Sequence, residues 1–105
     1  MKKHFLIVLL AFSLSSCTWV KLTPEAEKVR VLSAQEVQSC TKKGKTTVSV
    51  KADVAGIERS HEKVKTELET LARNSAVELK GDTVVPASEI KDGKQTFDVY
   101  RCINP

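Results

Sequence analysis

The sequence contains little glycine, and its four glycines are scattered. It therefore lacks the glycine-rich loop with which nucleotide-binding folds cradle phosphates. Histidine is also scarce, since only His4 and His61 are present, and the cysteines form no Cys-x-x-Cys pair. Because stable metal and redox sites need such groups close together, we expect neither. No serine lies in a motif typical of an activated nucleophile, so we expect no enzyme and no cofactor.

Long apolar runs are also missing, apart from HFLIVLLAF at residues 4–12. That run has about half the length that a bilayer-spanning helix requires. Lys2 and Lys3 precede the run and small polar residues follow it, which is the pattern of a secretory signal peptide. We therefore predict a signal peptide over residues 1–16, with a permanent transmembrane helix as the alternative.

A strong excess of one charge is absent once this segment is removed. Lys2 and Lys3 are two of the 17 basic side chains, and none of the 13 acidic ones lies in residues 1–16. The remaining chain is nearly balanced, which argues against a nucleic-acid partner.

The stretch LSSC at residues 14–17, which spans the end of the predicted signal peptide, resembles a bacterial lipobox. The resemblance implies diacylglycerol on the thiol of Cys17, cleavage before it and acylation, typically with palmitate, of the new amino group. Residue 18 is Thr rather than the Asp common in inner-membrane lipoproteins, which favours the periplasmic face of the outer membrane. The alternative is an ordinary cleavage that leaves a free thiol. Residues 17–28 then form a lipidated tether, in which Trp19 either sits among lipid headgroups or is exposed.

Two cysteines remain, Cys40 and Cys102. An exported chain enters an oxidising compartment, and two thiols allow one intramolecular pair. We predict a Cys40–Cys102 disulfide, which a domain of under about 90 residues needs for its stability. A redox or metal role for the two thiols is the alternative.

The remaining pattern predicts a single α+β domain over residues 29–105. A helix within 57–81 places Val64, Leu68 and Leu71 on one apolar face, with Glu69 and Arg73 paired on the solvent side and Gly81 ending it in the left-handed conformation. The strands are expected at 29–32, 46–52, 82–87 and 95–102, with TKKGK (41–45) as a turn that is either solvated or in contact with anionic lipid. The architecture is ββαββ, a small four-stranded sheet with one helix packed on one face.

A hairpin at KDGK (91–94) joins the last two strands, and two registers are open. A two-residue Asp92-Gly93 turn sets Val85 opposite Tyr100. A three-residue turn sets Val85 opposite Val99 and is favoured, because it keeps the apolar residues on the helix face.

The residues C…G…LARNSAVELKGDTVV…VYRC, from Cys40 to Cys102, resemble a family of small Gram-negative lipoproteins of unknown function. Gly81-Asp82 stands where that family has a Gly-Asn element. More distantly, the pattern is similar to the outer-membrane lipoprotein sensor of the Rcs envelope-stress phosphorelay, although the long tether and additional cysteines of that sensor are missing. The nearer family implies no established activity.

With the favoured register, Val84, Pro86 and Tyr100 lie on the face away from the helix, as a candidate partner surface. The alternative is that the segment around Leu32 covers this face. Glu58, His61 and Glu62 share a helix face, but we expect solvated side chains there and no metal.

We expect a lipid-anchored, non-enzymatic binding or structural module of the envelope, attached to the membrane through Cys17 and able to contact an envelope protein. The alternatives are an envelope-stress sensing partner of a signalling system and a lipoprotein that binds a small ligand or a metal.

Overall fold

A computed structural model of the protein describes residues 20–54 and 56–104. The predicted signal peptide and the predicted lipidation site Cys17 lie outside these described residues. The elements are, in chain order, η1 (Glu25–Lys28), β1 (Arg30–Val31), η2 (Ala34–Val37), β2 (Thr41–Ser49), β3 (Asp53–Val54), β4 (Ile57–Glu58), α2 (His61–Glu78), β5 (Thr83–Pro86) and β6 (Lys94–Arg101).

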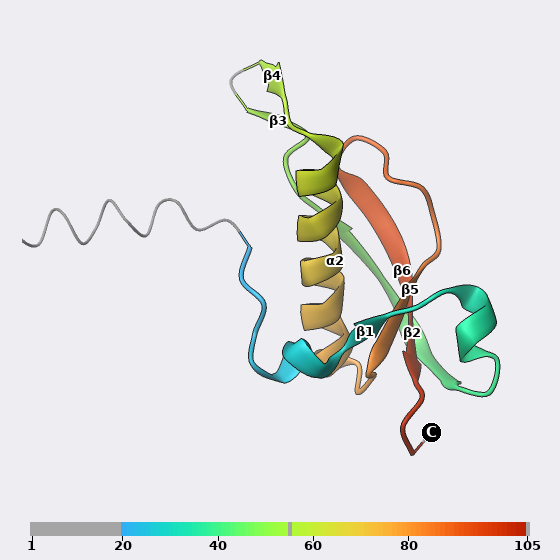
Figure 1. The fold of residues 1–105 in the computed structure, drawn as a ribbon. Coiled ribbons are helices and arrows are strands. Elements are labelled where there is room, and N and C mark those ends of the chain that lie inside the picture. The colour runs from blue at the N-terminus through green and yellow to red at the C-terminus, as the bar shows by residue number, and fades with distance from the viewer. Residues whose placement is uncertain (1–19, 55, 105) are drawn as a thin grey trace, which may run out of the picture.

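Four of the strands form one sheet in the order β1-β5-β6-β2. The β1–β5 pair is parallel and the other two pairs are antiparallel. The helix α2 packs on one side of this sheet and the short helix η2 lies on the other (Figure 1). The predicted α+β fold, with a four-stranded sheet, one long helix and a disulfide, is confirmed. A separate two-stranded hairpin, β3–β4, was not predicted.

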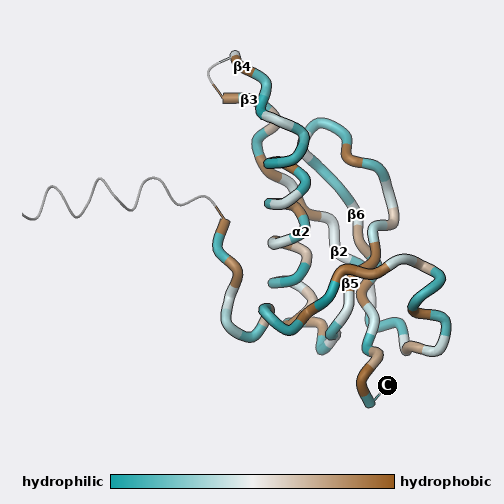
Figure 2. Tube along the Cα trace, in the orientation of Figure 1, coloured by the Kyte–Doolittle hydropathy of each residue, from teal (hydrophilic) through white to brown (hydrophobic). Residues whose placement is uncertain are grey.

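The helix α2 begins after Ser60, whose Oγ accepts a hydrogen bond from the backbone N–H of Lys63 at 3.2 Å. Its buried residues recur every fourth position and form one stripe against the sheet: Val64, Leu68, Ala72 and Ala76. Along the tube of Figure 2, α2 accordingly alternates between hydrophilic and hydrophobic residues. The apolar face was therefore predicted correctly.

The end of α2 differs from the prediction. Lys80, not Gly81, adopts the left-handed conformation, with φ 65°. The N–H groups of both residues donate to carbonyls of the last helical turn, which is the Schellman arrangement. A Cβ atom on Gly81 would overlap Cγ1 of Val99 and lie 2.9 Å from the carbonyl oxygen of Tyr100. Gly81 is therefore required for close packing against β6.

The turn before β6 is a two-residue turn at Asp92-Gly93, where both residues have positive φ, 52° and 71°. Lys91 and Lys94 exchange backbone hydrogen bonds of 2.9 and 3.0 Å across it. Asp-Gly is a favoured pair for this type of turn. The turn thus matches the less favoured of the two predicted alternatives.

The register of β5 against β6 matches neither alternative, because Val84, rather than Val85, is the partner of Val99. Residues 87–90 face only two residues of the opposite strand between the Pro86–Phe97 pair and the Lys91–Lys94 bridge, so the register slips there. Because side chains alternate along a strand, a shift of one residue moves each side chain to the other face. Val84 consequently joins Phe97 and Val99 in the core.

Strand β2 starts at Thr41 and includes the residues that were predicted as a basic turn. A bulge at Lys43 interrupts its pairing with β6, between Lys42 and Gly44. The sequence signal was misread because a glycine among lysines is typical of turns, whereas here it accompanies a bulge. β2 lies at one edge of the sheet.

Candidate functional site

The first described segment, residues 20–29, is not a free tether. We call it the N-terminal strap. Its short helix η1 buries Ala26 completely, and Val29 is also buried in the same core as α2. Docking of an alanine and a valine onto a helix stripe removes apolar surface from water and fixes the segment. The predicted tether boundary at residue 28 is therefore wrong for the strap, which is part of the domain.

Asn74 of α2 holds the beginning of the strap with both atoms of its amide. Its Oδ1 accepts a hydrogen bond from the N–H of Thr23 at 3.0 Å, and its Nδ2 donates to the carbonyl oxygen of Lys21 at 2.9 Å. The side-chain amide of Asn74 thus bonds to one backbone donor and one backbone acceptor of the strap, as a neighbouring β-strand would do. The chain is thus fixed to the helix from Lys21 onward.

Arg73 holds the end of the strap. Its Nε donates to the carbonyl oxygen of Val29 at 2.8 Å, and its Nη2 donates to that of Glu27 at 3.1 Å. The predicted pairing of Arg73 with Glu69 is wrong, because the guanidinium is engaged by the strap. Arg73 and Asn74 were missed as positioning residues because no local motif distinguishes them from other polar residues of a helix.

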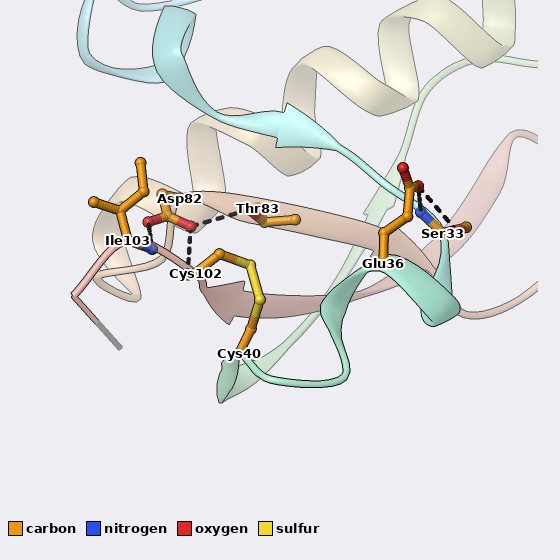
Figure 3. Close-up of a disulfide and its surroundings, with 7 residues drawn as sticks. All are labelled: Ser33, Glu36, Cys40, Asp82, Thr83, Cys102 and Ile103. Atoms are coloured by element: carbon orange, nitrogen blue, oxygen red, sulfur yellow. Dashed lines mark hydrogen bonds between the residues drawn. A yellow bond between two sulfur atoms is a disulfide. The ribbon is translucent and has the colours of Figure 1, made fainter.

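The Cys40–Cys102 disulfide is confirmed, with Cα atoms 4.4 Å apart and a sequence separation of 62 residues. It joins the start of β2 to the end of β6 on the side of the sheet away from α2 (Figure 3). The chain-entropy model assigns a loop of this length about 4 kcal/mol of stabilisation.

Asp82 fixes the backbone next to this disulfide, as Figure 3 shows. Its Oδ1 accepts from the N–H of Cys102 at 2.8 Å and its Oδ2 accepts from that of Ile103 at 2.9 Å. The hydroxyl of Thr83 donates a third hydrogen bond to the carboxylate, at 3.0 Å. Burial opposes ionisation, but these three donors and the charge of Arg101 outweigh it and lower the pKa of Asp82. Asp82 is therefore a structural carboxylate.

The candidate partner surface is not assembled as predicted. Val84 is 0% exposed and belongs to the core, which corrects its assignment to the open face. Pro86 is exposed and lies opposite Phe97, whereas Tyr100 lies opposite Thr83. The three residues are not brought together, because β5 pairs with β6 one residue away from the favoured register.

The face away from α2 is partly covered by η2, as the alternative around Leu32 anticipated (Figure 1). Val37 of η2 and Val85 of β5 are both buried, although neither belongs to the core around α2. A capping box between Ser33 and Glu36 stabilises the start of η2. The hydrogen bonds from Ser33 lower the pKa of Glu36. A hollow of about 460 Å³ lies between this segment, the end of β5 and α2, and Leu32, Pro86 and Lys65 are among the residues that line it.

Two of the three lysines of β2 form ion pairs with the neighbouring strand. The ammonium groups of Lys42 and Lys45 lie 3.3 and 3.7 Å from Oδ1 of Asp98, the carboxylate on the neighbouring strand. Residues 41–45 therefore do not form the turn for which contact with anionic lipid was considered. Lys42 and Lys45 instead compensate the charge of Asp98.

Within residues 20–54 and 56–104, no group of three or more His, Cys, Asp or Glu side chains could hold a metal ion. Glu58, His61 and Glu62 are all exposed, and Glu58 precedes α2 rather than lying on it. A hollow of about 730 Å³ is lined by the loop before β6 together with Thr47 and Thr96. Those two hydroxyls bond to each other at 2.8 Å. No pair of a nucleophile and a base is arranged there.

None of the helices in the described part of the chain has the length and apolar character that a bilayer crossing requires.

Comparison with known proteins gives a family but no activity. No curated protein and no solved structure shows significant similarity to the chain. A family model described as a domain of unknown function, DUF4156, matches residues 20–102, which run from the strap to the second cysteine of the disulfide. That match spans most of the chain, and the protein therefore belongs to the DUF4156 family.

Proposed function

We propose that the protein is a lipoprotein of the bacterial outer membrane, anchored through lipid on Cys17, whose domain faces the periplasm as a non-enzymatic binding or structural module. The observation that carries this proposal is the Cys40–Cys102 disulfide. Disulfides form and persist in oxidising compartments, which agrees with an exported chain. The disulfide supports export only, and the proposed lipid attachment rests on the LSSC sequence.

The N-terminal strap supports a closely held domain. Lys21 is already bonded to Asn74, so only residues 18–20 separate the proposed lipidated residue from the docked chain. The four steps from Cys17 to Lys21 span at most about 14 Å when extended. A domain held so closely works at the membrane surface and does not reach across a wide gap.

The non-enzymatic part of the proposal is supported by how the polar groups are used. Ser88 accepts a hydrogen bond from the N–H of Thr96, and the side-chain amide of Gln95 donates to the carbonyl oxygen of Ser88. The carboxylate of Asp82 accepts from the backbone directly after β6, and the guanidinium of Arg73 donates to the backbone of the strap. Groups that satisfy the fold in this way have no free partner for acid–base or nucleophilic work.

The test is mass spectrometry of the protein extracted from envelopes. The wild type should carry diacylglycerol on Cys17 and an acyl chain on its amino group, in the outer-membrane fraction. Cys17→Ser should accumulate as the uncleaved precursor without the thioether lipid. Cys102→Ala is the matched control, because it also removes a thiol but should leave the lipid in place. An unmodified Cys17 thiol in the wild type would contradict the proposal.

A second candidate function, a sensing partner of an envelope-stress signalling system, is favoured by the two paired cysteines that carry the distant resemblance to the Rcs sensor. Deletion of the gene should then alter transcription that depends on that phosphorelay, and complementation with wild type should restore it. Transcription that does not change under envelope stress would reject this function. Crosslinking in intact envelopes would identify the partner of a purely structural module.

A further inference from the structure

The β3–β4 hairpin carries two exposed aliphatic residues, Val54 and Ile57. Val54 and Ile57 are partners across the hairpin and are 41% and 72% exposed. The hairpin projects from the body of the domain beyond the start of α2 (Figure 1), and the end of β3 carries the hydrophobic colour in Figure 2. Single exposed aliphatic residues are common, so their exposure alone decides nothing.

Hydrogen bonds and an ion pair hold the hairpin in a fixed position relative to α2. Arg59, directly after β4, donates its backbone N–H to the carbonyl oxygen of Ala52 at 3.0 Å. Its side chain donates to the carbonyl oxygen of Lys51 at 3.1 Å and to Oε2 of Glu67 on α2 at 2.7 Å. The Arg59 and Glu67 side chains are only 8% and 13% exposed, so the ion pair is well shielded from solvent. The base of the hairpin is thereby fixed to the helix.

The hairpin and the strap leave the domain on the same side. In the view of Figure 1, the ribbons of the hairpin and of the segment that begins at residue 20 both extend further to the left than those of α2 and the sheet. Asn74, which holds the strap, lies 14 positions along the helix from its cap Ser60. At about 1.5 Å per residue the two points of contact are roughly 21 Å apart along α2.

We propose that the β3–β4 hairpin is a second membrane contact, in which Val54 and Ile57 enter the lipid leaflet that holds the chain at Cys17. This inference rests on the lipid anchor of the proposed function. With the strap docked, the anchor is too short to let the domain stand far from the leaflet. Contact at both points sets α2 approximately parallel to the membrane and leaves the sheet face with η2 directed toward the periplasm.

The charges of the hairpin indicate what kind of lipid surface it meets. Asp53 and Glu58 lie directly opposite each other at its base, so this pair would be repelled by anionic headgroups. The contact is therefore made by the aliphatic tip with a mostly zwitterionic leaflet. Such a contact is driven by burial of apolar surface and is insensitive to salt, unlike attraction of lysines to anionic lipid.

The experiment uses the full lipoprotein in phosphatidylethanolamine–phosphatidylcholine vesicles, with and without brominated acyl chains that quench tryptophan. Trp19, the only tryptophan of the chain, reports the anchor in the wild type. Ile57→Trp in a Trp19→Phe background reports the hairpin and should lose most of its fluorescence in brominated vesicles, at low and at high salt. Ile103→Trp in the same background is the matched control, because Ile103 is 62% exposed near the other end of the domain and should not be quenched.

The outcomes separate the two proposals. Quenching at position 19 without quenching at position 57 leaves the lipid anchor intact and overturns the hairpin contact. A blue-shifted but unquenched tryptophan at position 57 also overturns it, in favour of contact with a second copy of the chain. An unlipidated Cys17 by mass spectrometry overturns both proposals. Val54→Trp repeats the measurement if Ile57→Trp does not give the wild-type circular dichroism spectrum.

Discussion

The junction between α2 and β5 offers a sharp test, because Lys80 and Gly81 have opposite requirements there. Lys80 is the residue with φ 65°, a conformation that costs a residue with a Cβ about 1 kcal/mol or more relative to glycine. Its side chain has no hydrogen bond that the substitution would remove among those of the described residues, and its carbonyl, which accepts from Nη1 of Arg101, is retained. Lys80→Gly should therefore raise the free energy of unfolding by about 1 kcal/mol.

Gly81→Ala should have the opposite effect. The new Cβ would overlap Val99, which is completely buried, and would lie 2.9 Å from the backbone oxygen of Tyr100. Neither group can move away without disturbing β6 where it pairs with β5. Overpacking of this kind typically costs about 1–3 kcal/mol.

Urea unfolding followed by circular dichroism measures both effects. With an m-value of about 1 kcal/mol/M for a small domain, the midpoint should rise by about 1 M for Lys80→Gly and fall by about 1–3 M for Gly81→Ala. The double variant, which moves the glycine by one position, should remain less stable than Lys80→Gly. If Gly81→Ala matched the wild type, or if Lys80→Gly lowered the midpoint, the described geometry of this junction would be refuted.

Three further effects on stability are expected. Leu68→Ala should lower the free energy of unfolding by about 2–5 kcal/mol, because Leu68 is fully buried. Lys65→Ala, at an exposed position of the same helix, should change it by less than about 0.5 kcal/mol. Equal losses for the two variants in urea titrations would refute the assigned helix face. Cys102→Ala should cost about 2–4 kcal/mol, and a thermal midpoint unchanged from that of the oxidised wild type would contradict a stabilising disulfide. The pKa of Asp82 is lowered in the fold, so its contribution should be complete above about pH 5 and be lost as the pH falls through the folded pKa. Asp82→Asn should therefore flatten the acid side of a plot of urea midpoint against pH, and an unaltered acid side would count against this role.

Much of the fold follows from local patterns. The recurrence of Val64, Leu68 and Ala72 indicates a one-sided helix because a period near 3.6 admits no other regular structure. The disulfide follows from the presence of two thiols and the expectation that the chain is exported. The Asp-Gly pair correctly locates the turn before β6, although its two-residue form was the less favoured of the two alternatives.

The rest depends on contacts distant in sequence. The pairing of β5 with β6 is set by the two-residue turn together with the extra residues at 87–90, which no local pattern encodes. The net shift of one residue from the favoured register moved Val84 from the predicted open face into the core. The N-terminal strap looked like a tether because it has no periodicity. Its bonds to Arg73 and Asn74 and the burial of Ala26 and Val29 make it part of the domain. Gly81 was recognised as important for the wrong reason, since close approach and left-handed geometry give the same signal in a sequence.

The position of β2 at the sheet edge has a consequence for behaviour at high local concentration. Nine residues of strand with one free edge would offer a template for another copy of the chain, and anchoring to a leaflet would bring copies together in two dimensions. The bulge at Lys43 breaks the regular spacing of that edge, and three lysines within four positions add mutual repulsion between copies. These features should keep the protein from polymerising edge to edge into amyloid-like fibres on the membrane.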